Sequence, residues 1–234
     1  MIIGILDAHT KDYQGMANIS TPNRIKYADY HTYPFFVYNI EELDQNRTPH
    51  WGKIIGIKEH LNKCDWLFYC DTDALIVNFN IKLDTFIDAN YNIILGPLPF
   101  EGPLSTSAFF IKNCDWSYDF LDEWYGQTKF IDRPYYCDPT SDCYGTGVVT
   151  IRGSGMLFDQ SALAYLYDTK ADVRSKIKRL RNSQFNAIPG RYKRNDFLIH
   201  FPSFLYDDKF FAATDLKLEA MRSWGKKTMK AILC

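Results

Sequence analysis

The chain has 234 residues, a length typical of a single domain. It carries 27 lysines and arginines against 28 aspartates and glutamates, so its formal net charge is −1. This balance argues against a protein that holds nucleic acid by bulk charge, since such domains are strongly basic. No apolar run approaches the roughly 20 residues needed to cross a bilayer. Aromatic residues make up 16% of the chain, and because disordered chains are poor in them, the sequence predicts a folded domain.

Short apolar runs alternate with helical patterns through the first half of the chain. In chain order they predict a strand at 2–6, a polar loop at 11–23, a helix at 23–31, a strand at 35–38, a helix at 51–61, strands at 66–70, 93–95 and 108–111, and a helix at 116–125. Gly15 and Pro22 favour the loop, since both residue types disfavour a helix interior. The alternation predicts an α/β fold with a mainly parallel sheet flanked by helices.

The second half of the chain is less regular. Residues 126–155 are rich in glycine and proline, so we expect long loops there with a short strand at 148–151. Helical patterns follow at 159–167, 170–181 and 214–233. One face of the middle helix would carry three basic residues, which we interpret as a solvent-facing surface, with contact to an anionic membrane or partner as the alternative: Arg174, Lys178 and Arg181. No linker divides the chain, so we expect one domain.

The N-terminus and the cysteines bear on the compartment. Residues 2–6 are too few for the apolar core of a signal peptide, and no basic residue precedes them. We therefore expect a cytoplasmic protein if the chain is full length, and a protein of the Golgi lumen if it is trimmed from an anchored precursor. The six cysteines include no C-x-x-C motif, so we expect mainly free thiols, with Cys137 and Cys143 as the pair to bridge in an oxidising compartment. The oligomeric state is left open.

The strongest local signal is the pair Asp71 and Asp73, which directly follows the apolar run at 66–70. Unpaired carboxylates in such an apolar segment would carry a large desolvation penalty. On extended chain, Asp-x-Asp places both side chains on one face. Open α/β sheets bind ligands at the carboxyl ends of their strands, and carboxylate oxygens suit Mg²⁺ or Mn²⁺. The pattern predicts a metal site that contacts the phosphates of a nucleotide.

Two other interpretations of this segment stay open. Asp71 could cap a helix within a turn while Asp73 pairs with a lysine. Phosphatases of the haloacid-dehalogenase type also begin with a strand that runs into Asp-x-Asp, and in that case Asp71 would be the nucleophile. Ala74 fits their pattern poorly, although Asp207 and Asp208 could serve as their second acidic motif.

A histidine and a third carboxylate extend the candidate site. His200 ends the apolar run at 197–199, where it is either a core residue or a ligand, since imidazole commonly binds metals. Together with Asp71 and Asp73 it would supply two oxygen ligands and one nitrogen ligand. Asp159 begins a predicted helix, where it is either an N-terminal cap or a contact for an acceptor hydroxyl or a donor sugar.

Six stretches together resemble one family, the retaining α-glycosyltransferases of glycosyltransferase family 34, which includes fungal α-galactosyl- and α-mannosyltransferases and plant xyloglucan α-xylosyltransferases. They follow one another in the family's order: Asn23 to Tyr33, Trp51 to Lys53 with the helix after it, Asp65 to Ile76, Phe109 to Trp124, Asp159 to Leu163, and Phe197 to Pro202. The match covers most of the chain. Its specificity comes from the number and order of the motifs rather than from any single one.

The resemblance implies a GT-A fold, which is a Rossmann-like mixed sheet, together with Mn²⁺ or Mg²⁺, a nucleotide-sugar donor and an oligosaccharide or glycan acceptor. By matching position, it implies that Asp71, Asp73 and His200 bind the metal, and that Asp159 and Gln160 face the transferred sugar and the acceptor. It also implies donor contacts from six residues: Thr10, Tyr27, Lys53, Thr72, Ser107 and Lys209. The alternative to a donor contact for Lys53 is a position on the water-facing side of its helix.

The chain departs from the family pattern at three places. Ser105-Thr106-Ser107 stands where relatives read Asn-Thr-Gly, and Phe158 stands where xylosyltransferase relatives carry a further Asp. Ser203 and Leu205 occupy the places of a Gly and a Lys, which makes Lys209 the nearest lysine beyond that point.

The sequence therefore predicts a metal-dependent retaining glycosyltransferase that moves galactose, xylose, mannose or glucose, expected from a UDP-sugar, to a glycan hydroxyl. No carboxylate stands out as a covalent nucleophile, so we favour attack from the face that the nucleotide leaves, with Gln160 positioning the acceptor. Residues 1–80 would bind the nucleotide, and 81–234 would carry the acceptor loops. The rivals are the phosphatase, a glycan-binding module without catalysis, and a family member that binds nucleotide without turnover.

Two aromatic clusters are candidates for stacking on sugar rings, which suit flat apolar surfaces. One lies in the long loop and one follows the predicted strand that ends at His200: Tyr135, Tyr136 and Tyr144 in the first, and Phe204, Tyr206, Phe210 and Phe211 in the second. Most of the remaining aromatic residues are expected in the core.

Overall fold

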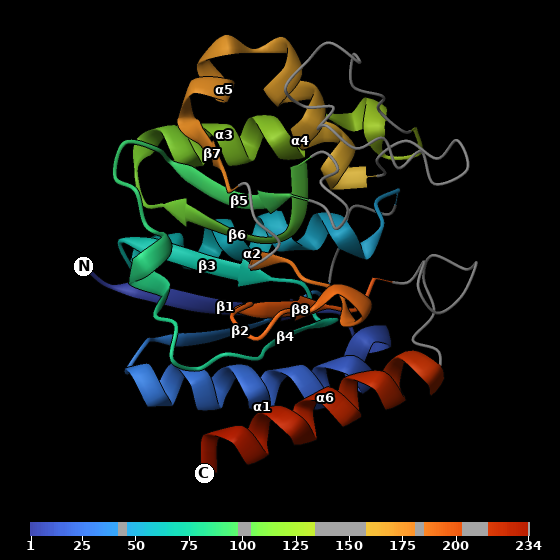
Figure 1. Ribbon diagram of the computed structural model, residues 1–234. Helices are drawn as coiled ribbons and strands as arrows, with labels where there is room; N and C mark the ends of the chain where they lie inside the picture. Colours follow the sequence, from blue (N-terminus) through green and yellow to red (C-terminus); the bar gives the residue numbers. More distant parts are fainter. Residues whose placement is uncertain (42–45, 98–103, 134–157, 181–184, 203–214, 234) are drawn as a thin grey trace.

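The computed structural model describes residues 1–41, 46–97, 104–133, 158–180, 185–202 and 215–233 of the chain (Figure 1). Its main sheet has six strands in the order β2-β1-β3-β6-β5-β7. Their bounds are Phe35–Asn39 for β2, Ile3–His9 for β1, Trp66–Cys70 for β3, Leu104–Lys112 for β6, Ile93–Pro97 for β5 and Ile177–Arg179 for β7. β6 pairs antiparallel with β3 and β5, whereas the other neighbours pair in parallel, so the sheet is mixed and mainly parallel, as predicted.

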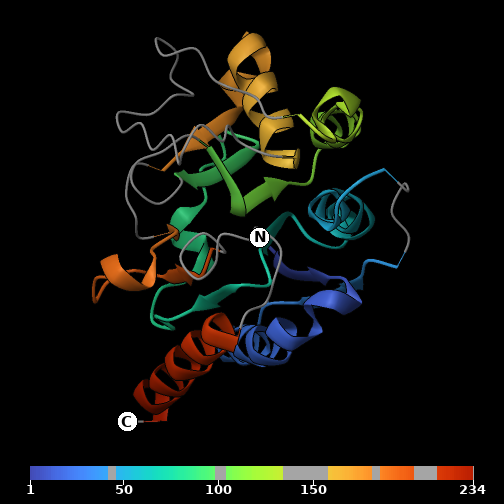
Figure 2. The ribbon, with the colours of Figure 1, turned by 90° about the vertical axis from the view of Figure 1, so that its right-hand side faces the viewer.

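Helices cover both faces of this sheet (Figures 1 and 2). One face carries α2 Gly52–His60, α3 Asp115–Tyr125 and α4 Phe158–Thr169, and the other carries α1 Gln14–His31. α5 Ala171–Lys176 leads from α4 into β7, and α6 Asp215–Leu233 packs against α1. Because both faces are covered, β1 and β3 are buried along their whole lengths. None of the described helices is long and apolar enough to span a membrane.

Most of the predicted elements are confirmed with shifted ends, but residues 14–22 form a helix where the sequence predicted a loop. α1 runs through Pro22 without ending. Its buried residues follow helical spacing: Met16, Ala17, Ser20, Asn23, Arg24, Tyr27 and Ala28. Burial of this face against the sheet and α6 stabilises the helix across the proline, and local residue preferences do not contain that tertiary contribution.

The predicted helix at 170–181 is also wrong in its second half. α5 ends at Lys176, and the next three residues form β7, which pairs in parallel with β5 at the edge of the sheet. This long-range pairing satisfies backbone groups of β5 that would otherwise lie at a free edge.

The basic residues of this segment make intramolecular contacts. Arg174 donates to the carbonyl oxygens of Tyr167 and Asp168 at the end of α4. Lys178 pairs with Asp88 at 2.8 Å. Arg174 on α5 and Lys178 on β7 therefore do not share one solvent-facing helix surface, which corrects the interpretation for these two residues, and Arg181 lies outside the described residues.

Several expectations fall on residues that the structure does not describe. They include the strand at 148–151, the pair Cys137 and Cys143, and both candidate clusters for sugar stacking. Among the described cysteines, Cys64, Cys70 and Cys114 are free thiols.

Gly52 lets the start of α2 lie close to the chain that follows β2. A Cβ atom at this position would lie 2.6 Å from Cγ2 and 2.7 Å from Cδ1 of Ile40, which is buried. We expect Gly52→Ala to lower the free energy of unfolding by about 1–3 kcal/mol in urea denaturation, because overpacked side chains must shift. Gly190→Ala is the control, since an added Cβ meets no atom within 4 Å there. Equal stability of the two variants would contradict this account of the packing.

Candidate active site

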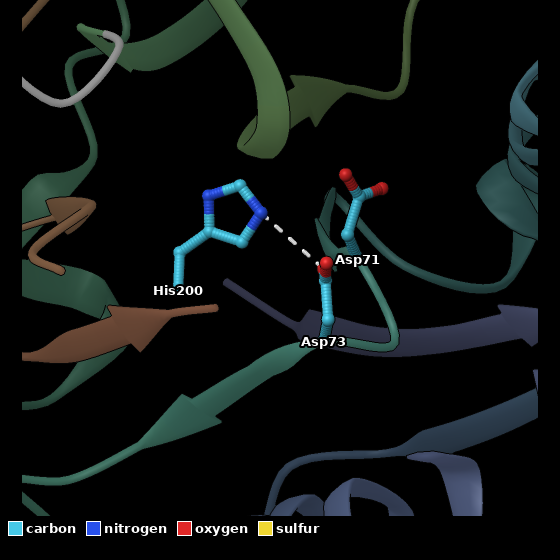
Figure 3. Close-up of side chains that lie close together, drawn as sticks. All are labelled: Asp71, Asp73 and His200. Carbon is cyan, nitrogen blue, oxygen red and sulfur yellow. Dashed lines mark ion pairs between the residues drawn. The ribbon is translucent and has the colours of Figure 1, made fainter. Parts of the chain in front are cut away.

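Asp71 and Asp73 lie in a turn that joins β3 to the short strand β4 Ala74–Ile76 (Figure 3). The backbone N–H of Ala74 donates to the carbonyl oxygen of Asp71 at 3.0 Å, which closes the turn. The N–H of Asp71 donates to the carbonyl oxygen of Ser107 on β6 at 2.7 Å. The extended geometry expected for Asp-x-Asp is therefore wrong. A turn brings the two carboxylates together instead, and β4, which follows it, pairs with β8 outside the main sheet.

His200 reaches this turn through strand pairing. β8 Leu198–His200 pairs antiparallel with β4, in a register that places His200 opposite Ala74. The N–H of Phe201 donates to the carbonyl oxygen of Asp73 at 2.9 Å. Backbone hydrogen bonds thus fix a residue that is more than a hundred positions away in the sequence beside both aspartates.

Asp71, Asp73 and His200 form a set that could hold a divalent cation. Each offers one ligand atom, and these atoms all lie within 4.8 Å of one another. Figure 3 shows the imidazole facing the carboxylate of Asp73, with Nε2 of His200 at 3.3 Å from Oδ1. Within the described part of the chain, the buried Nδ1 atom of His200 has no hydrogen-bond partner. Two carboxylates and one imidazole are ligands that Mn²⁺ accepts.

Lys53 connects the turn to the start of α4. Its ammonium nitrogen lies 2.9 Å from Oδ1 of Asp71 and 3.3 Å from Oδ2 of Asp159. Lys53 is only 3% exposed, so the alternative of a lysine on the water-facing side of α2 is wrong. Burial acts to lower the pKa of this lysine, but the charges of Asp159 and Asp71 outweigh burial and hold its pKa above the usual range. Lys53 therefore carries its positive charge inside the site.

Lys217 of α6 enters the same site from the other side. Its nitrogen lies 2.6 Å from Oδ2 of Asp73, and the residue is 1% exposed. Burial acts to raise the pKa of Asp73, but Lys217 and then His200 outweigh burial and hold that pKa far below its usual range. The sequence predicted that Lys209 would supply a lysine to the donor site, but Lys209 lies outside the described residues. The signal it missed is a lysine on the buried stripe of α6, one helical turn before Met221.

A cleft opens at the carboxyl ends of β1 and β3, where these side chains meet. It is lined by Ala8, His9, Thr10, Tyr13, Ile40, Pro49, His50, Lys53, Tyr69, Asp71, Thr72, Asp73 and Lys217. Among the described residues linked by ion pairs here, the carboxylates of Asp71, Asp73 and Asp159 outnumber the ammonium groups of Lys53 and Lys217 by one. This excess of negative charge favours a bound cation.

The comparison with protein families decides where the chain belongs. The model of the galactosyl transferase GMA12/MNN10 family matches residues 1–93 and 100–204. The chain belongs to this family. The resemblance drawn from the six motifs is thereby confirmed.

Three plant proteins are among the relatives that match part of the chain. The chain is 32% identical to probable glycosyltransferase 2 of Oryza sativa subsp. japonica over 160 residues, which are 63% of this chain and 32% of that protein. It is 26% identical to galactomannan galactosyltransferase 1 of Cyamopsis tetragonoloba over 172 residues, 66% of this chain and 37% of the relative. Against probable xyloglucan 6-xylosyltransferase 3 of Arabidopsis thaliana, 115 residues match at 29% identity, 45% of this chain and 25% of the relative. The chain thus spans between a quarter and two fifths of these relatives.

Solved structures share the fold. A glycosyltransferase involved in glycosylation of the major capsid of PBCV-1 matches with a TM-score of 0.66 at 16% identity, over 94% of this chain and 99% of that one. The galactosyltransferase LgtC matches with a TM-score of 0.52 at 12% identity, over 97% and 96% of the two chains. The chain therefore has the GT-A fold that the sequence predicted.

Asp159 and Gln160 lie in the first turn of α4, and Lys53 links Asp159 to the turn that carries Asp71 and Asp73. Asp159 is 2% exposed, and its carbonyl oxygen accepts a hydrogen bond from the indole of Trp124 at 2.7 Å. Its carboxylate reaches the turn through Lys53. Gln160 is half-buried at the next position.

The remaining predicted donor contacts divide into two groups. Thr10 and Thr72 line the cleft, and the hydroxyl of Thr72 donates to the carbonyl oxygen of Ala8 at 3.4 Å. Tyr27 lies in the core, away from the cleft lining, where its hydroxyl donates to the carbonyl oxygen of Ile81 at 2.6 Å. Ser107 is buried in β6 and contacts Asp71 through its backbone.

Tyr13 and His50 line the cleft, and sequence reasoning did not select them. Burial raises the pKa of Tyr13 to about 12, with further contributions from Asp73 and Asp71. Burial lowers the pKa of His50 against the opposing charge of Asp159, so the neutral imidazole is favoured. The ring of His50 stacks on Phe158, with ring centroids 5.0 Å apart, and Phe158 has a left-handed φ of 55°. The sequence feature that could have identified His50 is its position immediately before the motif Trp51 to Lys53.

Proposed function

We propose that this chain is a metal-dependent retaining glycosyltransferase that moves galactose, xylose, mannose or glucose from a nucleotide sugar, a UDP-sugar in our proposal, to a glycan hydroxyl. The observation that carries the proposal is the convergence of Asp71, Asp73 and His200 beside a cleft at the carboxyl ends of β1 and β3. Membership of the family supports it, as do plant relatives named as xylosyltransferases and a galactosyltransferase.

Asp71, Asp73 and His200 would hold the cation, for which we propose Mn²⁺ or Mg²⁺. When bound, such a cation neutralises negative charge that develops on the diphosphate as the sugar leaves. Thr10, Thr72 and Lys53 would contact the donor, with Thr72 near the ribose. Nearly all of the cleft lining lies within residues 8–73, which supports the assignment of residues 1–80 to nucleotide binding.

We propose a role for Ser107 through the turn that it holds rather than through direct contact, and none for Tyr27, because its side chain packs in the core. A donor contact of Lys209 stays a prediction.

Asp159 and Gln160 would lie on the sugar side of the site. In the proposed reaction the acceptor oxygen bonds to the anomeric carbon as the bond between that carbon and the phosphate oxygen breaks, both on one face of the sugar. The acceptor proton passes to the departing phosphate oxygen. Gln160 would position the acceptor, and Asp159 with Lys53 would keep the start of α4 aligned with the metal-binding turn.

The test is incubation of the protein with Mn²⁺, a panel of nucleotide sugars and a panel of oligosaccharide acceptors. We expect release of nucleoside diphosphate from at least one donor and transfer with retained anomeric configuration. Hydrolysis of phosphate monoesters with a phospho-aspartyl Asp71 would establish the phosphatase instead. Metal-independent glycan binding without donor consumption would establish the binding module, and nucleotide binding without turnover would establish the inactive family member.

We expect Lys217→Met to weaken binding of a nucleoside diphosphate, at saturating Mn²⁺, by about 10–100-fold. A hydrogen bond from a charged group contributes about 1.5–3 kcal/mol, and the diphosphate would offer Lys217 such an acceptor. Isothermal titration calorimetry measures the loss. Lys226→Met, on the exposed side of the same helix, is the matched control and should leave affinity unchanged. Equal affinities of the two variants would remove Lys217 from the donor site.

A further inference from the structure

Arg24 of α1 lies directly beneath the turn that carries the metal ligands. It is fully buried, and one guanidinium nitrogen, Nη1, lies 2.9 Å from Oδ1 of Asp7. The other terminal nitrogen, Nη2, donates to the carbonyl oxygen of Ala74 at 3.2 Å and also to the carbonyl oxygen of Asp71. These two carbonyl groups mark the beginning and the end of the turn. One side chain therefore holds both ends of the segment that presents Asp71 and Asp73.

The neighbouring residue on α1, Asn23, holds the strand that follows the turn. Its side-chain amide donates to the carbonyl oxygen of Ile76 at 2.9 Å and accepts from the N–H of Ile76 at 2.9 Å. This pair of bonds imitates strand pairing along one edge of β4. The other edge of β4 pairs with β8, which carries His200. Two adjacent residues of one helix thus hold the backbone from Asp71 to Ile76 directly, and β4 in turn pairs with the strand that carries His200.

The positive charge of Arg24 is balanced by Asp7, which does not line the cleft. Asp7 is fully buried, accepts a hydrogen bond from Thr21, and lies 3.6 Å from Nδ1 of His9. Burial acts to raise the pKa of Asp7, but Arg24 together with His9 and the hydrogen bond from Thr21 outweighs burial, so the net pKa is lowered and the charged form of Asp7 is favoured. Asp7 neutralises the positive charge of this guanidinium. Arg24 therefore holds the backbone of the turn in place without adding net charge to the site.

We infer that Arg24 and Asn23 are positioning residues for metal binding, acting through the backbone of the segment from Asp71 to Ile76. This inference rests on the proposed function. Arginine suits the role because its planar fork reaches Asp7 and two carbonyl oxygens at once, which a lysine ammonium on a flexible stem does not. The alternative is a purely structural role, in which the same contacts stabilise the fold and leave the ligand geometry unaffected.

The test compares Arg24→Lys and Asn23→Ala with Tyr27→Phe. Tyr27 is buried on the same helix and its hydroxyl bonds a carbonyl oxygen outside the turn, so Tyr27→Phe removes a comparable hydrogen bond without touching the segment. Mn²⁺ affinity is measured by electron paramagnetic resonance in the absence of nucleotide, and stability by urea denaturation. Hydrogen exchange of the Ala74 amide, which closes the turn, reports turn geometry in the metal-free protein.

We expect Arg24→Lys and Asn23→Ala to raise the Kd for Mn²⁺ by about 10–100-fold, as loss of groups that orient ligands does at other metal sites. Exchange of the Ala74 amide should quicken in both variants. Tyr27→Phe should lose stability with an unchanged Kd and unchanged exchange. In transfer assays, saturating Mn²⁺ should restore most of the kcat of the two positioning variants.

Unchanged Mn²⁺ affinity in a folded Arg24→Lys or Asn23→Ala variant would overturn the inference. If Arg24→Lys does not fold, Asn23→Ala decides the question alone, because it leaves the buried ion pair intact. Failure of the wild-type protein to bind Mn²⁺ would instead overturn the proposed function, so the two failures are distinguished by the wild-type measurement.

Discussion

Asp73→Asn is expected to lower metal-dependent sugar transfer by about three orders of magnitude. The substitution removes one of two carboxylate ligands from the proposed site, and charge stabilisation by a bound cation contributes several kcal/mol to such a transition state. Release of nucleoside diphosphate at saturating donor and Mn²⁺ is the measurement. A glycan-binding module would keep its full affinity for glycan in this variant, which separates the two functions.

The same substitution leaves Lys217 buried without its carboxylate partner, so part of any loss could come from unfolding. Breaking a buried ion pair on one side costs about 3–5 kcal/mol of stability. The double variant Asp73→Asn, Lys217→Met removes both charges and is expected to recover most of this stability without recovering activity. A stable double variant that still transfers sugar in a Mn²⁺-dependent manner would contradict the assignment of Asp73 as a metal ligand.

Lys53→Met is expected to lower the free energy of unfolding by about 3–5 kcal/mol and to abolish transfer. The lysine is the shared partner of Asp71 and Asp159, and Asp159 is almost fully buried, so its carboxylate would be left uncompensated. Urea denaturation at neutral pH measures the stability change. The combination Lys53→Met, Asp159→Asn should recover the larger part of it.

Lys58→Met supplies the matched control on the same helix. Lys58 pairs with Asp122, but both side chains are largely exposed, at 43% and 63%. Exposed ion pairs contribute about 0–1 kcal/mol, so this variant should be nearly as stable as the wild type and fully active. Comparable losses in Lys53→Met and Lys58→Met would show that burial does not distinguish the two lysines.

The sequence was most informative where a signal is local. A run of apolar residues ending in Asp-x-Asp places a strand and two carboxylates within a few positions, and the structure confirms the strand at 66–70. His200 was found in the same way, as a polar residue at the end of an apolar run, and β8 ends on it. Motif order was sufficient to select the family. The strand, the carboxylates, the histidine and each single motif depend on residues close together in the chain, whereas the family depends on the order of motifs along most of it.

The errors arose where distant contacts outweigh local preference. Pro22 favours a loop, but packing of α1 against the sheet and α6 retains the helix. The segment after Lys176 has a helical pattern, but β5 offers an edge that only the folded sheet creates. Asp-x-Asp suggests extended chain, but the ladder between β4 and β8 requires a turn at that point.

By itself, the sequence predicted an α/β fold from apolar periodicity and candidate metal ligands from short motifs, and the order of its six motifs selected the family, whose resemblance implied the GT-A fold. Only the tertiary structure determined which charged groups surround the site and which contacts hold its backbone in place. It buried Lys53 between two carboxylates, brought Lys217 to Asp73 from 144 positions away, and placed Arg24 beneath the turn. The physical reason is that a buried charge is stable only beside a partner, and the chain's path through space decides which partner it meets.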